Sequence, residues 1–214
     1  MAWCEAGAAG SCPPDPDVRE RLLRAAVDIF DRKGYAATSV REIVERAGIT
    51  KPVLYYHFGS KEGILIAILE EGARQFLAAV QRAAAGGGTA RQRLEALCEQ
   101  AFGLFKENVP VARVAHAIYY GPREGMPTFD FAVFERSLIG ATRQIIEDGV
   151  ASCELRPGPI EHMATAVTAV IAVCSDQEIC TFGTPLGLDG LHGVLDVIFQ
   201  GLLARHETQG ELTQ

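Results

Sequence analysis

The chain has 214 residues, of which 48% are hydrophobic and 22% charged, and its formal net charge is −7. Enough apolar surface is present to bury a core, so the composition excludes a chain that is disordered throughout. It also excludes a uniformly basic nucleic-acid binder, but the charge is unevenly spread. Residues 17–61 carry nine Lys/Arg and six Asp/Glu, a net charge of +3, which leaves −10 for the remainder. The N-terminal part is therefore suited to an anionic partner.

Six cysteines lie at positions 4, 12, 98, 153, 174 and 180. No two have C-x-x-C spacing, and no Cys/His group has the spacing of a zinc site. The residues before Cys12 lack the basic start and apolar run of a signal peptide, and no apolar run reaches the roughly 18–20 residues of a membrane span. We therefore expect reduced thiols, no metal, no membrane association and a cytoplasmic protein.

The elements predicted along the chain are all helices. Residues 1–16 are rich in Gly, Ala and Pro and are predicted to form a disordered tail. Apolar residues then recur at helical spacing between Gly- and Pro-containing breaks, and no segment alternates as a strand does, so the predicted fold class is all-α. The predicted helices span residues 18–33, 40–47, 51–58, 61–85, 94–105, 111–120, 131–149, 159–180 and 188–206.

The segment from Thr38 to Leu65 predicts two short helices joined by a tight turn. Ser39 followed by Glu42 is a capping box that begins the first helix, and Gly48 tolerates the left-handed conformation that ends it. Thr50 is expected to cap the second helix and Pro52 fits its first turn, while Ser60 is expected to cap the third helix. This arrangement is the helix-turn-helix pattern, in which the second helix enters the major groove of DNA.

Two apolar positions of that second helix, Leu54 and Phe58, are four residues apart and are expected to bury one face. The groups left outside are a cation, two phenols, an imidazole and an apolar side chain, which suit phosphates and base edges. They are Lys51, Val53, Tyr55, Tyr56 and His57.

The sequence "SVREIVERAGITKPVLYYHFGSKEGIL" resembles the DNA-binding segment of the TetR family of transcriptional regulators, and the resemblance extends over about residues 18–69. It implies a homodimeric regulator that binds a double-stranded DNA operator, with an N-terminal helix-turn-helix domain at 17–62, a helical ligand-binding and dimerisation domain at 63–207 and a tail at 208–214. Gly59 and Gly63 depart from the family pattern. The implied DNA-contacting residues are Ser39, Arg41, Thr50, Lys51, Pro52, Val53, Tyr55, Tyr56, His57 and Lys61, the last as a phosphate ligand at a helix N-terminus.

The last two predicted helices are suited to close helix packing. The final helix carries a 3-4-3-4 apolar stripe, and the helix before it is rich in alanine, which lets helices approach closely. The resemblance places a four-helix dimer interface here, although an intramolecular core has the same pattern. The interface residues predicted are Ala166, Ala169, Leu191, Leu195, Ile198 and Leu202.

The middle helices are rich in aromatic residues, and the resemblance implies that they enclose a pocket for a small, largely apolar ligand. Periodicity alone does not separate a pocket wall from a packed core. The pocket residues predicted are Phe102, Phe105, His116, Tyr119, Tyr120, Phe134 and Met163. The implied function is a repressor that such a ligand releases from DNA.

The alternatives to this function are a redox-sensing DNA-binding regulator that acts through cysteines, and a helical small-molecule-binding protein or enzyme. An enzyme is not expected, because the five histidines are scattered and no motif of a hydrolase, a metalloprotease or a phosphate-binding loop is present, so no catalytic residue or cofactor is predicted. A redox-sensing regulator stays open, but Cys174 and Cys180 are six residues apart on one predicted helix and face different directions.

Overall fold

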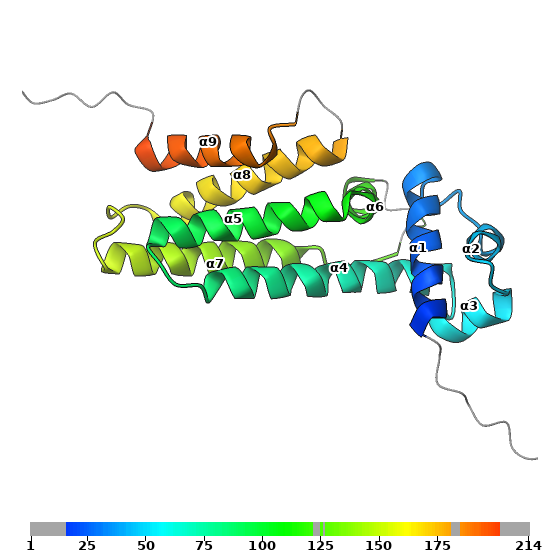
Figure 1. The fold of residues 1–214 in the computed structure, drawn as a ribbon. Coiled ribbons are helices and arrows are strands. Elements are labelled where there is room, and N and C mark those ends of the chain that lie inside the picture. Colours follow the sequence, from blue (N-terminus) through cyan, green and yellow to red (C-terminus); the bar gives the residue numbers. More distant parts are fainter. Residues whose placement is uncertain (1–15, 122–124, 126, 181–184, 202–214) are drawn as a thin grey trace, which may run out of the picture. The chain divides into compact units, whose positions relative to one another are not determined.

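A computed structural model describes residues 16–121, 125, 127–180 and 185–201. The described residues form helices and connecting loops and contain no strand, which confirms the all-α class. The helices are α1 (Pro16–Lys33), α2 (Val40–Ala47), α3 (Lys51–Phe58), α4 (Lys61–Ala84), α5 (Ala90–Glu107), α6 (Val109–Tyr120), α7 (Ala132–Ala151), α8 (Ile160–Cys180) and α9 (Gly187–Gln200) (Figure 1). Of the predicted tails at 1–16 and 208–214, residues 1–15 and 208–214 lie outside the described residues, as does Leu202, whereas Pro16 begins α1.

The chain divides into two compact units. The first comprises residues 1–70 and 114–129, and the second comprises residues 71–113 and 130–214. The division falls within α4, so the first turns of this helix belong to the first unit. Ile64, Leu65 and Ile68 in these turns are buried, and so are Val114 and Ile118 of α6. The first unit therefore contains more than the three helices predicted for residues 17–62.

In the first unit, α1 packs on α2, and α2 contacts α3 (Figure 1). All three helices contribute side chains to the core of this unit. These include Leu22, Ala26 and Phe30 from α1, Ile43 and Val44 from α2, and Leu54 from α3. Helices of eight residues are too short to be stable alone, so this burial and the caps described below hold α2 and α3 in place.

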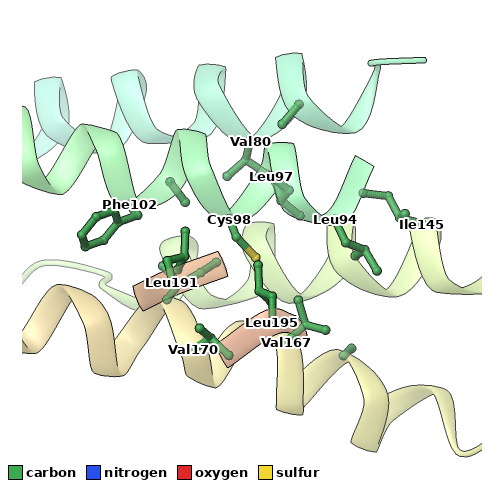
Figure 2. Packing of buried hydrophobic residues seen from close by; sticks show 14 of the residues in the cluster. Val80, Leu94, Leu97, Cys98, Phe102, Ile145, Val167, Val170, Leu191 and Leu195 are labelled. Atoms are coloured by element: carbon green, nitrogen blue, oxygen red, sulfur yellow. The ribbon is translucent and has the colours of Figure 1, made fainter. Parts of the chain in front are cut away.

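The second unit has a single apolar core. In it, α5 packs against α7, α8 and α9, and α8 packs against α7 and α9. Figure 2 shows side chains from α5, α7, α8 and α9 converging, with Cys98 among them. Two polar contacts also fix α9 on α5: Arg91 pairs with Asp196, and a His192 ring nitrogen lies 2.6 Å from a Glu99 carboxylate oxygen. The inner face of α9 therefore belongs to the core of its own chain.

Candidate nucleic-acid interface

The N-terminus of α2 is fixed by the predicted capping box. The Ser39 hydroxyl accepts from the Glu42 N–H at 3.4 Å, and the Glu42 carboxylate accepts from the Ser39 N–H at 2.9 Å. Lys33 of α1 also pairs with this carboxylate. The hydrogen bond from Lys33, followed by those from Ser39, lowers the pKa of Glu42 to about 2. The exposed Ser39 thus begins α2 at a defined position.

The turn after α2 follows the predicted geometry. Gly48 has φ 65° and ψ 35°, in the left-handed region that glycine adopts without strain. The Ile49 N–H donates to the Val44 carbonyl at 2.9 Å, which is the closing bond of a Schellman motif. Arg21 of α1 donates to the Ala47 carbonyl at 2.7 Å and so secures the turn to α1. Sequence reasoning missed this role of Arg21, because a long side chain reaching a distant carbonyl has no sequence signature.

The start of α3 differs from the prediction. Thr50 occupies the N-cap position, but its side chain makes no capping hydrogen bond. Pro52 has no N–H to offer, and the N–H groups of Val53 and Leu54 donate instead to the Thr50 backbone carbonyl, both at 3.2 Å. The hydroxyl of this exposed residue is therefore not used in capping.

The outer face of α3 carries the groups that the sequence placed there. Leu54 is its one buried residue, whereas Tyr55 and Tyr56 are 50% and 65% exposed. Lys51 and Pro52 are exposed, and Val53 and His57 are half-buried. Phe58 is half-buried rather than buried, and the Arg19 guanidinium lies 5.5 Å from the centre of its ring. The helix thus presents a cation, phenols and an imidazole next to one another.

Two predicted phosphate ligands already have partners within the first unit. Arg41 is exposed and donates from Nε to Glu45 at 2.6 Å, an i,i+4 pair of the kind that contributes little in water and exchanges readily for another anion. The Lys61 ammonium donates to the backbone carbonyls of Tyr35 and Thr38, at 2.9 and 2.8 Å. The contact of Lys61 with phosphate stays a prediction.

The first turn of α4 lies close against the end of α3. The Ser60 hydroxyl accepts from the Gly63 N–H at 3.0 Å, so Ser60 caps α4 as predicted. A Cβ atom on Gly63 would lie 1.9 Å from the Phe58 carbonyl oxygen. The lack of a side chain at Gly63 therefore lets the first turn of α4 pack closely against the end of α3.

The predicted pocket residues fall into two groups. Phe102 is buried in the core of the second unit, and Phe105, Phe134 and Met163 pack against that core, with Phe105 and Phe134 at 5.9 and 5.3 Å from the Phe76 ring. The other three lie on α6. Tyr119 and Tyr120 are 55% and 69% exposed, and the half-buried His116 has its ring 4.5 Å from that of Tyr120. Phe105 and Phe134 therefore meet at one edge of the core, around Phe76.

The predicted dimer interface needs a correction on α9. Leu191 and Leu195 are fully buried in the core of one chain, as Figure 2 shows, and Ile198 packs against the same core. Leu191 and Leu195 therefore have no surface to offer a partner, whereas Ile198 is only half-buried. Ala166 and Ala169 of α8 are exposed, as an interface requires. Leu188, the first residue of the predicted stripe, is exposed, and so are four apolar side chains that the stripe did not include, namely Val173, Leu186, Val194 and Val197.

Among the described residues, no group of three or more His, Cys, Asp or Glu side chains is arranged to hold a metal ion. The helices of this part of the chain include none that is long and apolar enough to span a membrane. Cys98 and Cys174 are buried, and burial raises the pKa of both thiols, that of Cys98 to about 12. Buried thiols of this kind are unreactive, so Cys98 and Cys174 are not suited to redox sensing, whereas Cys153 is exposed.

Comparison with known proteins shows the family to which the chain belongs. Residues 22–68 match the family model of bacterial regulatory proteins of the tetR family. The transcriptional repressor KstR2 of Mycolicibacterium smegmatis is 31% identical over 146 residues, which cover 65% of this chain and 68% of that protein. The chain belongs to the TetR family.

Other TetR-family relatives match over shorter stretches or in fold. The transcriptional activator FasR of Mycolicibacterium smegmatis is 36% identical over 99 residues, so this chain covers 45% of its length. The structure of the TetR regulator PfmR from Thermus thermophilus has a TM-score of 0.69 at 26% identity, covering 86% of this chain and all of that one. That of FadR from Bacillus subtilis in complex with stearoyl-CoA has a TM-score of 0.67 at 20% identity, over 86% of this chain and 99% of that one, which shows a shared fold.

Proposed function

We propose that the protein is a sequence-specific DNA-binding regulator of transcription in which α3 enters the major groove. The observation that carries the proposal is the outer face of α3, where Lys51, Tyr55 and Tyr56 are exposed beside His57 on a helix that buries Leu54 alone. Phenol, imidazole and ammonium groups bind base edges and phosphates. Family membership supports the same role.

We assign the DNA contacts by position. Thr50, Pro52 and Val53 start the groove-facing helix, and the unused hydroxyl of Thr50 is available to a phosphate oxygen. Ser39 and Arg41 lie at the N-terminus of α2, where exposed N–H groups and the helix dipole favour an anion. A phosphate would replace Glu45 as the partner of Arg41.

This assignment is tested on duplex DNA that the wild-type chain selects from a random-sequence pool. Lys51→Ala and Tyr56→Ala are expected to weaken binding, by roughly 1–3 kcal/mol where the side chain contacts a base. Lys106→Ala is the matched control, because Lys106 is an exposed lysine of α5 in the second unit. Unchanged affinity in both α3 variants would refute the assignment of the recognition helix.

We infer that the protein is a homodimer through the outer faces of α8 and α9. On α8, Ala166, Ala169 and Val173 share one face, and on α9 Val194 and Val197 do. These exposed faces combine small and β-branched side chains, which allow close helix contact. A two-fold dimer would also provide two α3 helices for two half-sites.

The dimer is tested by sedimentation at micromolar concentration. Wild type is expected to sediment as a dimer and Val194→Glu as a folded monomer, because the added charge lies at the surface of one chain but inside the interface of two. Gln81→Glu, with the same charge added at an exposed position of α4, is expected to remain a dimer. A monomeric wild type would exclude this interface.

The regulatory output proposed is repression relieved by a small, largely apolar ligand. Two relatives support this: KstR2 is named a repressor, and FadR was solved with stearoyl-CoA. Within the second unit, the half-buried Phe105 and Phe134 beside Phe76 offer an aromatic surface for an acyl chain. Stearoyl-CoA is therefore the first probe. It should lower DNA affinity by the ratio of its affinities for the two states, and unchanged DNA affinity with saturating stearoyl-CoA would exclude that ligand.

A further inference from the structure

Lys61, the first residue of α4, is half-buried, and its charged group contacts other parts of the first unit. Its ammonium donates to the Tyr35 carbonyl at 2.9 Å and to the Thr38 carbonyl at 2.8 Å. The same nitrogen lies 4.2 Å from the centre of the Tyr35 ring, within the range of a cation–π interaction. A lysine has three N–H donors, so two carbonyls and an aromatic face occupy the close surroundings of the charge.

The two carbonyls belong to the loop that leads into α2. Within this loop, the Thr38 hydroxyl donates to the Gly34 carbonyl at 2.8 Å, and the Thr38 N–H donates to the Tyr35 carbonyl at 3.1 Å. Thr38 is buried, and its carbonyl directly precedes Ser39, the cap of α2. Lys61 is thus bonded to the residue that directly precedes the cap of α2.

The pKa of Lys61 is consistent with a role in contacts within the chain. Burial, with a smaller contribution from Lys33, lowers the pKa of Lys61. A phosphate ligand on a protein surface is ordinarily a hydrated cation that is free to meet the anion. Lys51 fits that description, because it is exposed at the first position of α3. The two lysines have different surroundings although each begins a helix.

We propose that Lys61 is a positioning residue that ties the first turn of α4 to the loop before α2, and that it holds Ser39 and Arg41 in place for DNA without itself binding phosphate. The contacts of Lys61 are present in the chain without DNA, whereas their role in placing Ser39 and Arg41 rests on the DNA binding proposed above. The residue that contacts DNA and the residue that sets the contact geometry are then distinct lysines, Lys51 and Lys61.

Lysine acetylation of the wild-type chain with an N-hydroxysuccinimide ester, read by mass spectrometry, tests the proposal without a mutation. The lowered pKa of Lys61 raises its fraction of reactive unprotonated amine, whereas its contacts restrict access of the reagent, so each lysine is compared with itself, without and with DNA. DNA selected from a random pool is expected to protect Lys51 and to leave the rate at Lys61 unchanged. Protection of Lys61 by DNA would overturn the proposal.

Two variants give an independent measure. A lysine that neutralises a phosphate contributes about 0.9 to the slope of log affinity against log salt. Lys51→Met is expected to lower that slope, whereas Lys61→Met is expected to weaken binding about tenfold with the slope unchanged. Hydrogen exchange of residues 34–42 in the free chain should accelerate in Lys61→Met and not in Lys51→Met. Unchanged exchange with a reduced slope would make Lys61 a phosphate ligand.

The same data separate this proposal from the proposed function. If DNA protects no lysine, DNA binding through α3 fails, and the role of Lys61 at DNA fails with it. Faster hydrogen exchange of residues 34–42 in Lys61→Met would then still report the contacts of Lys61 with Tyr35 and Thr38. If DNA protects both Lys51 and Lys61, DNA binding stands and the positioning role is wrong.

Discussion

The short helices α3 and α9 both carry apolar side chains, but they use them differently. α3 buries Leu54 alone and turns polar and aromatic groups outward. α9 buries Leu191 and Leu195 in the core of its own chain and exposes Val194 and Val197 on another side. One apolar face is enough to fold a helix onto its own chain. A second apolar face, with no role in that core, indicates contact with another molecule.

The largest expected effect separates the two faces of α9. Leu195→Ala removes buried methyl groups from the core and is expected to lower the free energy of unfolding by roughly 2–5 kcal/mol at any protein concentration. Val194→Ala is expected to change it by less than about 0.5 kcal/mol in nanomolar solutions, where a dimer dissociates. Urea unfolding at two concentrations measures both. Equal losses in the two variants at nanomolar concentration would remove the distinction between the faces.

The next effect tests how tightly the first unit is packed beside α3. Alanine normally stabilises a helix interior relative to glycine by about 1 kcal/mol. In Gly63→Ala that gain is expected to be reversed, with a net loss of roughly 1–3 kcal/mol, because the new Cβ atom would meet the Phe58 carbonyl.

Gly103→Ala is the matched control, since a Cβ at this position of α5 meets no atom within 4 Å. It is expected to raise the melting temperature, whereas Gly63→Ala lowers it. If both variants gain stability, α4 does not approach α3 as closely as described.

A smaller effect compares two buried hydroxyl groups of the second unit. The Thr142 hydroxyl donates to the Leu138 carbonyl at 2.9 Å, whereas the Ser175 hydroxyl has no hydrogen-bond partner among the described residues. Thr142→Val should therefore cost about 1 kcal/mol, and Ser175→Ala should be neutral or stabilising. Thermal unfolding of the two variants measures the difference, and a larger loss in Ser175→Ala would mean that its hydroxyl is bonded.

The smallest effect concerns the exposed cap of α2 and depends on pH. The pKa of Glu42 in the folded chain is about 2, below its ordinary value of 4.5, because Lys33 and Ser39 bond the carboxylate. The stabilisation is present above pH 4.5 and is lost as the pH falls from 4.5 towards 2. The difference in stability between wild type and Glu42→Gln should therefore shrink over this range. A difference that stays constant between pH 6 and pH 3 would contradict the assignment.

Local chemistry made α2 and α3 predictable. Ser39, Glu42, Gly48 and Ser60 act through neighbours within a few residues, so their spacing in the sequence already specifies the caps and the turn. Thr50 was mispredicted as a side-chain cap, because Pro52 leaves one N–H fewer and the backbone carbonyl of Thr50 takes those that follow.

Long-range contacts were not predictable in the same way. Periodicity gives the direction of a side chain around its helix but not the element that covers it, so the stripe containing Leu191 and Leu195 was assigned to a partner rather than to the core. The contacts of Lys61 were not predictable for the same reason, since it donates to the backbone carbonyls of Tyr35 and Thr38, which lie in a loop distant in sequence. The DNA contacts on α3 and the ligand surface stay predictions.

The short length of α3 has a consequence for how the protein responds to heating. A helix of eight residues with one buried side chain opens at a lower free energy than the core around it. Warming should therefore melt α3 while the rest of the protein is still folded. The DNA binding proposed for α3 would then be lost several degrees below the unfolding temperature of the chain, so that temperature alone would change the fraction of DNA that is bound.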